Sequence, residues 1–429
     1  MKTTITTKDD SIITKVIITC FLTGCMEMYD FTIFGFLTET LKRNYFGFLD
    51  SKINSVISYM IVAVGFIFRP FGACIFGYLG DKFGRKKSLV ISILVMASTC
   101  LCIAVLPTFD SIGIISCYIL VLLRILQGIS VGGEYTGSVI FAIEHSKKEY
   151  KGLVGSIVTS GAMVGILLAS LVGFILQIKI LPSYSWRFAF VLGFLLSLLG
   201  FFVRDQLPET PVFIRSHDVS VAPIGKIAFW CTVQPFLKEC LCTIFIVGTS
   251  GVNFYFNIFY IPNYLTQVNI EVCELLSSLS VLVMIILVPV SGFLSDRIGR
   301  IRLMYIGVVA LIFSSFLLNF AIHSVKNNFT IYISVFMHII ANAIFTGPMN
   351  TLITEIFPTE VRYRCSAFSF TIGMGVVSGT MPMIDYMLYA YFGNIFCLGV
   401  YMSCISILGL YSLRILSNSI ANVKISLSI

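Results

Sequence analysis

Apolar stretches long enough to cross a bilayer recur along almost the entire chain. A membrane-spanning helix needs about 20 consecutive apolar residues, and such stretches follow one another through most of the sequence. Of the 429 residues, 57% are hydrophobic and 12% are charged, whereas about a quarter of a soluble protein is charged. The sequence therefore predicts an all-α membrane protein with twelve transmembrane helices. We expect them over residues 12–38, 55–80, 88–106, 112–144, 153–178, 186–206, 238–266, 274–296, 303–322, 328–357, 365–392 and 393–416.

The basic residues indicate how the chain is oriented. The net charge of +8 forms no single patch of the kind that binds nucleic acid, because Lys and Arg stand in short clusters between apolar runs. Such clusters favour the cytoplasmic side of a membrane, which places both termini in the cytoplasm. The first residues, MKTTITTKDDS, are polar, so the first helix is expected to act as the insertion signal. These features predict a multi-pass protein of the cell (inner) membrane.

One connection is much longer than the others. Residues 207–237 begin QLPETPVFIRSHDVSVAP and combine prolines, polar residues and charges of both signs at the midpoint of the chain. This pattern predicts a cytoplasmic linker between two six-helix bundles, residues 1–206 and 238–429.

The sequence lacks the signatures of catalysis and of bound cofactors. Its thirteen cysteines show neither metal-ligand nor disulfide spacing, and most lie in apolar runs, where cysteine behaves as a small hydrophobe. No GxxxxGK[ST] string for nucleotide binding is present. We therefore expect no enzymatic activity, no cofactor, no metal and no use of ATP by this chain.

A nine-residue string occurs twice, half a chain length apart. Residues 77–85 read GYLGDKFGR and residues 292–300 read GFLSDRIGR, each at the end of the second helix of its half. The repeated positions are Gly77 and Gly292, Asp81 and Asp296, Gly84 and Gly299, and Arg85 and Arg300. Two copies at the same place in both halves predict that the two halves are homologous.

The doubled string, the twelve spans and the central linker resemble the major facilitator superfamily. Further strings resemble its metabolite:proton symporter branch, which includes proline/betaine carriers: EMYDF at 27–31, FRPFGA at 68–73, RILQGISVGGEY at 124–135, LPETPVF at 207–213 and EIFPTEVRYR at 355–364. The resemblance implies two bundles with a substrate site near the midplane between them. It also implies symport, because the fifth helix lacks the Gly-Pro string of drug antiporters.

The fifth helix carries a ridge of small residues. Gly161, Gly165, Ala169 and Gly173 recur at four-residue spacing. Small residues at this spacing allow a neighbouring helix to approach closely. We expect this ridge to serve packing only.

Charged residues inside the predicted helices are candidates for proton coupling. A charge at a helix centre costs about 2.5–3.5 kcal/mol, so it faces a cavity or a partner. Glu27 and Asp30 share one face of the first helix, and Arg124 lies at a comparable depth in the fourth. One hypothesis is a proton switch, in which loss of the pairing between Asp30 and Arg124 lets a proton bind. The alternative is a static ion pair. Glu134, in a glycine-rich stretch, either joins the proton route or satisfies a neighbouring helix.

Other polar residues in the spans are candidates for the solute cavity. Arg69, followed by Pro70, either binds a carboxylate or braces the second helix. Amides in hydrocarbon need partners, so Asn253 and Asn257, four apart in the seventh helix, are expected to point inward. The complete predicted cavity set is Tyr29, Arg69, Asn253, Asn257 and Tyr260. We assign no role to Asp385, and read His338 as hydrogen-bonded packing rather than a titrating group.

The repeated loops are candidates for a cytoplasmic gate. Asp81 and Asp296 are expected to face the positive N-terminus of a helix from the other half. We expect the two signature arginines to pair with Glu144 and Glu355, which end the fourth and tenth helices. The resemblance implies that such contacts form a latch that holds one access state. The alternative is that the basic loops only set topology.

These features favour proton-driven import of a small polar solute by alternating access. The resemblance implies a zwitterion such as proline or betaine first and a small carboxylate second. The expected partners are the solute, a proton and the bilayer, with the chain working as a monomer. The alternatives are a proton-independent facilitator and a membrane sensor that binds solute without moving it.

Overall fold

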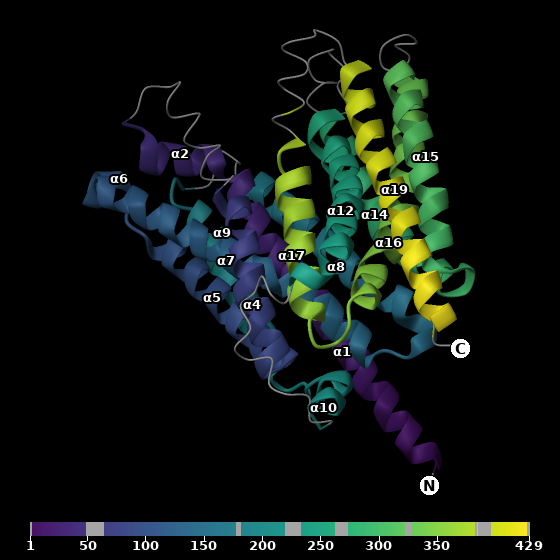
Figure 1. Cartoon of the computed structure of the whole chain (residues 1–429). Coiled ribbons are helices and arrows are strands. Elements are labelled where there is room, and N and C mark those ends of the chain that lie inside the picture. Colours follow the sequence, from purple (N-terminus) through teal and green to yellow (C-terminus); the bar gives the residue numbers. More distant parts are fainter. Residues whose placement is uncertain are drawn as a thin grey trace. The chain divides into compact units, whose positions relative to one another are not determined.

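A computed structural model describes residues 2–48, 64–176, 182–218, 233–261, 273–321, 328–381, 384 and 396–426. These residues form helices and short connections, with no strand among them. Ten of the described helices are long and apolar enough to cross a membrane. The prediction of an all-α membrane fold is confirmed (Figure 1).

The helices follow the apolar windows but often extend beyond them. In the first half they are α1 (Lys2–Phe36), α2 (Thr38–Phe46), α4 (Arg69–Phe83), α5 (Arg85–Val105), α6 (Phe109–Ile112), α7 (Ile114–His145), the 3₁₀ turn η1 (Lys148–Tyr150), α8 (Lys151–Leu176), α9 (Trp186–Asp205) and α10 (Pro211–Asp218). The first helix begins ten residues before its predicted start, because backbone hydrogen bonding does not require an apolar window. Part of the predicted linker is helical, as α10.

The described residues of the second half include π-helical segments. Its elements are the 3₁₀ turn η2 (Gln234–Phe236), α12 (Leu237–Tyr255), the π segment η3 (Phe256–Tyr260), α14 (Cys273–Ile298), α15 (Arg300–Phe320), α16 (Asn328–Ile356), α17 (Arg362–Thr371), the π segment η5 (Ile372–Ser378) and α19 (Phe396–Ser426). Single π turns inside helices are frequent at functional sites. The start of the predicted helix 55–80 and most of 382–395 lie outside the described residues.

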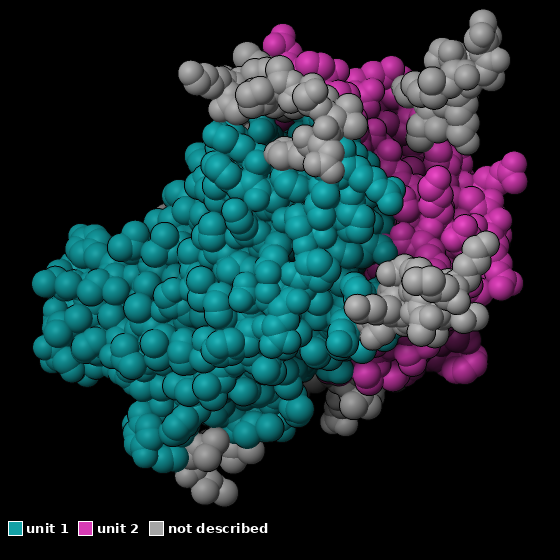
Figure 2. Space-filling model, turned by 90° about the horizontal axis from the view of Figure 1, so that it is seen from below, with its two compact units in different colours: residues 1–145, 161–229, 359–368 teal, residues 146–160, 230–358, 369–429 magenta. Residues whose placement is uncertain are grey.

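The chain divides into two compact units (Figure 2). Unit 1 comprises residues 1–145, 161–229 and 359–368, and unit 2 comprises residues 146–160, 230–358 and 369–429. Each unit thus includes a short segment from the opposite half of the sequence. The predicted domain boundaries at 206 and 238 remain a prediction.

Small residues bring helices of unit 1 into close contact. A Cβ atom on Gly161 or Gly165 of α8 would collide with the carbonyl oxygens of Phe21 and Cys25 in α1. The packing role predicted for the ridge is therefore confirmed. Gly128 of α7 approaches the backbone of Gly65 in the same way, so α7 is held close to the chain that leads into α4.

One glycine of each repeated string has a left-handed backbone. Gly84 has φ +107° and separates α4 from α5, while Gly299 has φ +101° and separates α14 from α15. A residue with a Cβ atom is strained at such angles. This requirement explains why both copies of the string carry glycine immediately before the arginine.

Candidate functional site

Two acidic side chains of α1 are buried inside unit 1. Glu27 is 2% exposed and Asp30 is fully buried. Asp30 accepts a hydrogen bond of 2.6 Å at Oδ2 from the hydroxyl of Ser197 in α9. Neither oxygen of Glu27 accepts a hydrogen bond of normal geometry within the described residues. The two carboxylates share a helix face as predicted, but they have different surroundings.

The predicted ion pair between Asp30 and Arg124 is wrong for this structure. Arg124 is fully buried in α7 and donates from Nη1 to Gln127 Oε1 at 3.2 Å and to the carbonyl of Phe31 at 3.4 Å. Its guanidinium also lies 4.2 Å from the ring centroid of Phe31 and 4.3 Å from that of Phe34. Aromatic faces attract cations, so Arg124 is stabilised by rings and carbonyl oxygens. Within the described chain it has no acidic partner.

An arginine that the sequence analysis missed takes the acidic partner instead. Arg204 of α9 is fully buried, and its Nη1 lies 3.6 Å from Oε1 of Glu134 in α7. Its Nη2 donates hydrogen bonds of 2.7 Å to Thr23 and Ser138. Arg204 thereby joins α1, α7 and α9 around one buried positive charge. Glu134 does pair with a neighbouring helix, which was one of the two expected outcomes.

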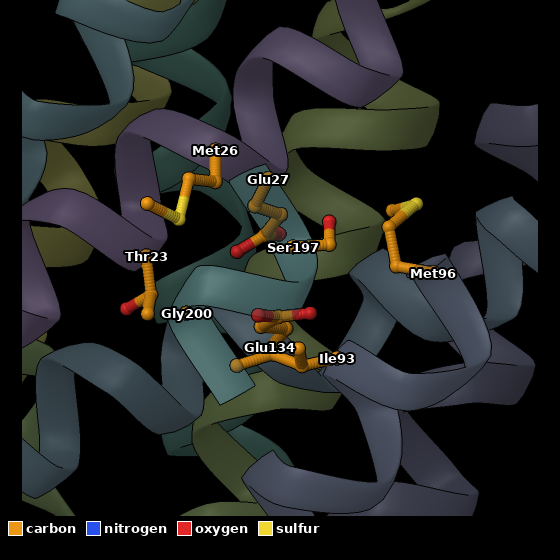
Figure 3. A pocket seen from close by; sticks show the side chains of 8 residues that line it. All are labelled: Thr23, Met26, Glu27, Ile93, Met96, Glu134, Ser197 and Gly200. Atoms are coloured by element: carbon orange, nitrogen blue, oxygen red, sulfur yellow. The ribbon is translucent and has the colours of Figure 1, made fainter. Parts of the chain in front are cut away.

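Glu27 and Glu134 line the same small cavity (Figure 3). The cavity has a volume of about 10 Å³, which is room for about one water molecule. The full lining is Thr23, Met26, Glu27, Ile93, Met96, Glu134, Ser197 and Gly200. In Figure 3 the two carboxyl groups point into the same space from α1 and α7. Asp30 and Arg124 do not line it.

Arg69 lies in the same region of unit 1, and Tyr29 packs elsewhere. The guanidinium of Arg69 is 3.9 Å from the ring centroid of Phe31 and 4.6 Å from that of Phe66. Arg69 and Arg124 therefore share the Phe31 ring. Tyr29 is buried in an apolar cluster, where its hydroxyl donates to the carbonyl of Ala189 at 3.0 Å. In this structure Tyr29 is a packing residue, and its predicted place in the cavity is not supported.

The predicted amide side chains of unit 2, Asn253 and Asn257, are buried, and their oxygens are available as hydrogen-bond acceptors. Asn253 donates to the carbonyl of Thr249 at 2.7 Å, and Asn257 donates to the carbonyl of Asn253 at 2.9 Å. The side-chain oxygens of Asn253 and Asn257 accept no hydrogen bond within the described residues. The backbone of Tyr260 belongs to η3, but its side chain lies outside the described part. Both amides thus stay candidates for solute contact.

His338 and Asp385 complete the predicted polar residues of the second half. His338 of α16 is fully buried and shares a 3.0 Å hydrogen bond between Nδ1 and the hydroxyl of Ser314. Its ring also packs against Phe256. This arrangement agrees with hydrogen-bonded packing. Asp385 lies outside the described residues.

In unit 1 the first signature aspartate binds a helix N-terminus. Asp81 accepts hydrogen bonds from the backbone amides of Tyr363 at 3.2 Å and Arg364 at 3.1 Å, in the first turn of α17. Arg85 lies 3.3 Å from Asp81 and 3.6 Å from Glu144. Gly77 lies against the backbone of Arg364, with no room for a Cβ atom. The predicted contacts of Asp81, Arg85 and Glu144 are all present.

Two arginines beside this contact were not predicted. Arg362 binds Glu144 at 2.8 Å, and Arg364 lies 3.5 Å from Asp81. Both belong to the EVRYR string, to which the sequence analysis assigned only a family resemblance.

In unit 2 the second signature aspartate repeats this geometry. Asp296 accepts hydrogen bonds from the amides of Gly152 at 2.8 Å and Leu153 at 2.9 Å, in the first turn of α8. Arg300 lies 3.2 Å from Asp296 and 2.8 Å from Glu355. In both units the aspartate binds the second and third amides of a helix, as a capping side chain does, and its charge complements the helix dipole. The role of these contacts as a gate remains a prediction.

Comparison with known proteins identifies the family. The model of the Major Facilitator Superfamily matches residues 19–382 and 243–421. The chain belongs to the major facilitator superfamily. It is 31% identical over 415 residues to a putative proline/betaine transporter of Staphylococcus haemolyticus, covering 94% of this chain and 88% of that protein. It is also 31% identical over 425 residues to the glycine betaine/proline/ectoine/pipecolic acid transporter OusA of Dickeya dadantii, covering 95% and 83%.

A solved structure of the same superfamily shares the fold. The proton:xylose symporter XylE bound to 6-bromo-6-deoxy-D-glucose superposes with a TM-score of 0.76 over 96% of each chain at 18% sequence identity. At this identity the likeness concerns the fold alone. The resemblance stated from the motifs is confirmed, and the chain is a multi-pass membrane transporter rather than an enzyme.

Proposed function

We propose that this transporter imports a small zwitterion of the proline or betaine type, or alternatively a small carboxylate, by proton symport. The named substrates of the relatives support the zwitterion. The observation that carries the proposal is Arg124, a buried cation with no acidic partner in the described chain. A buried charge without a counter-charge is costly, and a substrate carboxylate supplies the missing charge.

Arg124 has the donors that a carboxylate needs. Its Nε forms no hydrogen bond within the described residues, and a guanidinium binds a carboxylate through two parallel N–H groups. The guanidinium of Arg69 packs against the same Phe31 ring as that of Arg124. We assign both arginines to substrate binding in unit 1, and Asn253 and Asn257 to solute contact in unit 2.

The same unit supplies carboxylates for the proton. Glu27, Asp30 and Glu134 are buried in unit 1, where Arg69 and Arg204 lie near Glu27 and Arg204 contacts Glu134. A substrate carboxylate neutralises positive charge near these acids. Their ionised form is then less stabilised, and proton uptake is favoured. Solute and proton binding are thereby linked, and together they bias an alternating-access equilibrium. The two signature contacts hold one of its states.

The remaining assignments follow from the same proposal. We place the chain in the cell (inner) membrane as a monomer, with both termini in the cytoplasm and with bundles at residues 1–206 and 238–429 joined by the linker 207–237. The distribution of basic residues supports this orientation.

Uptake of radiolabelled solutes tests the function. A panel of zwitterions and small carboxylates is offered to cells that express the chain, with and without a pH gradient. We expect accumulation of a zwitterion that a protonophore abolishes. Uptake that stays unchanged under a protonophore would indicate a facilitator, and binding without counterflow in liposomes would indicate a sensor.

A further inference from the structure

The water-sized cavity of unit 1 brings together two carboxylates and one guanidinium. Glu27 and Glu134 line it, and Arg204 contacts Glu134 from one side. Glu27 and Glu134 are each 2% exposed, and Arg204 is fully buried. Bulk water therefore does not screen the repulsion between the two acids.

Arg204 forms its ion pair with Glu134 rather than with Glu27. Its Nη1 faces Glu134 Oε1, and its Nη2 is held by the hydroxyls of Thr23 and Ser138. The three remaining oxygens of the two carboxyl groups accept no hydrogen bond of normal geometry in the described part of the chain. A proton between the two groups would satisfy them directly, or through a water molecule in the cavity.

Helices α1, α4, α5, α7 and α9 supply the polar and charged groups around the cavity. On α1 the neighbouring acid is Asp30, whose Oδ2 is bound by Ser197 of α9. Arg69 of α4 adds positive charge near Glu27, and the backbone of Tyr135 in α7 lies beside its carboxyl group. From α5 the lining consists of Ile93 and Met96, with Ser92 beside Glu134. Glu134 is the acid that lines the cavity together with Glu27.

We propose that Glu27 and Glu134 together hold the transported proton across this cavity, and that Arg204 is the positioning residue that keeps Glu134 ionised. Two adjacent buried carboxylates cannot both ionise readily, so they bind one proton as a pair. The proton enters from water, forms an O–H bond on one carboxyl group and leaves to water on the other side. This inference rests on the proposed symport, and it assigns the proton to Glu27 and Glu134 rather than to Asp30 and Arg124.

Transport by purified protein in liposomes separates the two ideas. Glu27→Gln imitates the protonated acid, so we expect it to lose all protonophore-sensitive accumulation while it retains counterflow, which needs no net proton movement. Glu39→Gln, an exposed carboxylate of α2, is the matched control and keeps both activities. If the wild type itself shows no proton-driven accumulation, the proposed function fails. If the wild type accumulates solute and Glu27→Gln still does, only the proton assignment fails.

Two further measurements test the assignment, the first of them even if Glu27→Gln fails to fold. Arg204→Lys keeps the charge but loses the two hydrogen bonds that Nη2 donates to Thr23 and Ser138, so the charge is held less firmly beside Glu134. The carboxyl pair then keeps its proton up to a higher pH, and the alkaline limit of uptake moves to higher pH. An infrared difference spectrum recorded between acid and alkaline pH should show a buried carboxylic C=O band that Glu27→Gln removes. An unchanged pH profile in Arg204→Lys, or a band removed by Asp30→Asn instead, would overturn the assignment.

Discussion

Replacing Asp81 by asparagine should release the first turn of α17. Asp81 accepts two backbone hydrogen bonds, from Tyr363 and Arg364. Hydrogen bonds to a charged group contribute about 1.5–3 kcal/mol each. Asparagine keeps one neutral oxygen acceptor, worth about 1 kcal/mol. The net loss is therefore about 3 kcal/mol, which corresponds to about a 100-fold change in an equilibrium constant.

Amide hydrogen exchange measures this change at the two residues concerned. In Asp81→Asn, protection of the Tyr363 and Arg364 amides should fall about 100-fold. The matched control is Asp296→Asn, which should expose the amides of Gly152 and Leu153 and leave those of α17 protected. Unchanged exchange at Tyr363 and Arg364 in Asp81→Asn would refute the capping argument. Equal loss at both helices in either variant would show general unfolding instead.

Three further substitutions test backbone strain, helix contact and charge. Gly299→Ala should lower the free energy of unfolding by about 1–2 kcal/mol, because φ is +101° and the strain is not relieved or increased by any atom near the new Cβ. A dye that reacts with buried cysteines measures the lowered unfolding temperature. An unchanged unfolding temperature would contradict the strain. Gly165→Val should lower the unfolding temperature more than Gly299→Ala, because the new side chain collides with the carbonyl of Cys25. The control is Leu171→Val, at an exposed position of the same helix. Arg124→Gln should raise the solute concentration for half-maximal uptake at least tenfold, since a charged contact of about 1.5–3 kcal/mol is lost; unchanged uptake would exclude Arg124 from carboxylate binding.

The sequence was sufficient where one requirement dominates. An apolar window must become a helix in a bilayer because its backbone has no other hydrogen-bond partners. The repeated aspartates were predicted to face helix N-termini because the same acid followed the same helix in both halves. The glycines before Arg85 and Arg300 were noted only as repeated positions, and the structure adds the reason, a positive φ at both.

Side-chain partners inside unit 1 could not be predicted in this way. The spacing of Glu27 and Asp30 fixes their common face, but rotation of α1 about its axis decides which neighbour each one meets. Asp30 meets Ser197 rather than Arg124. Arg204 stands next to the end of α9, where an arginine commonly reaches the membrane surface, so its burial gave no signal in the sequence.

The segments exchanged between the two units affect how the protein comes apart. The chain passes from one unit to the other five times, at residues 145, 160, 229, 358 and 368. Cleavage within the linker removes only one of these five connections. Each fragment of the cut chain then carries residues of both units, and within unit 2 Gly152 and Leu153 of one fragment bind Asp296 of the other. A nicked protein should therefore stay assembled.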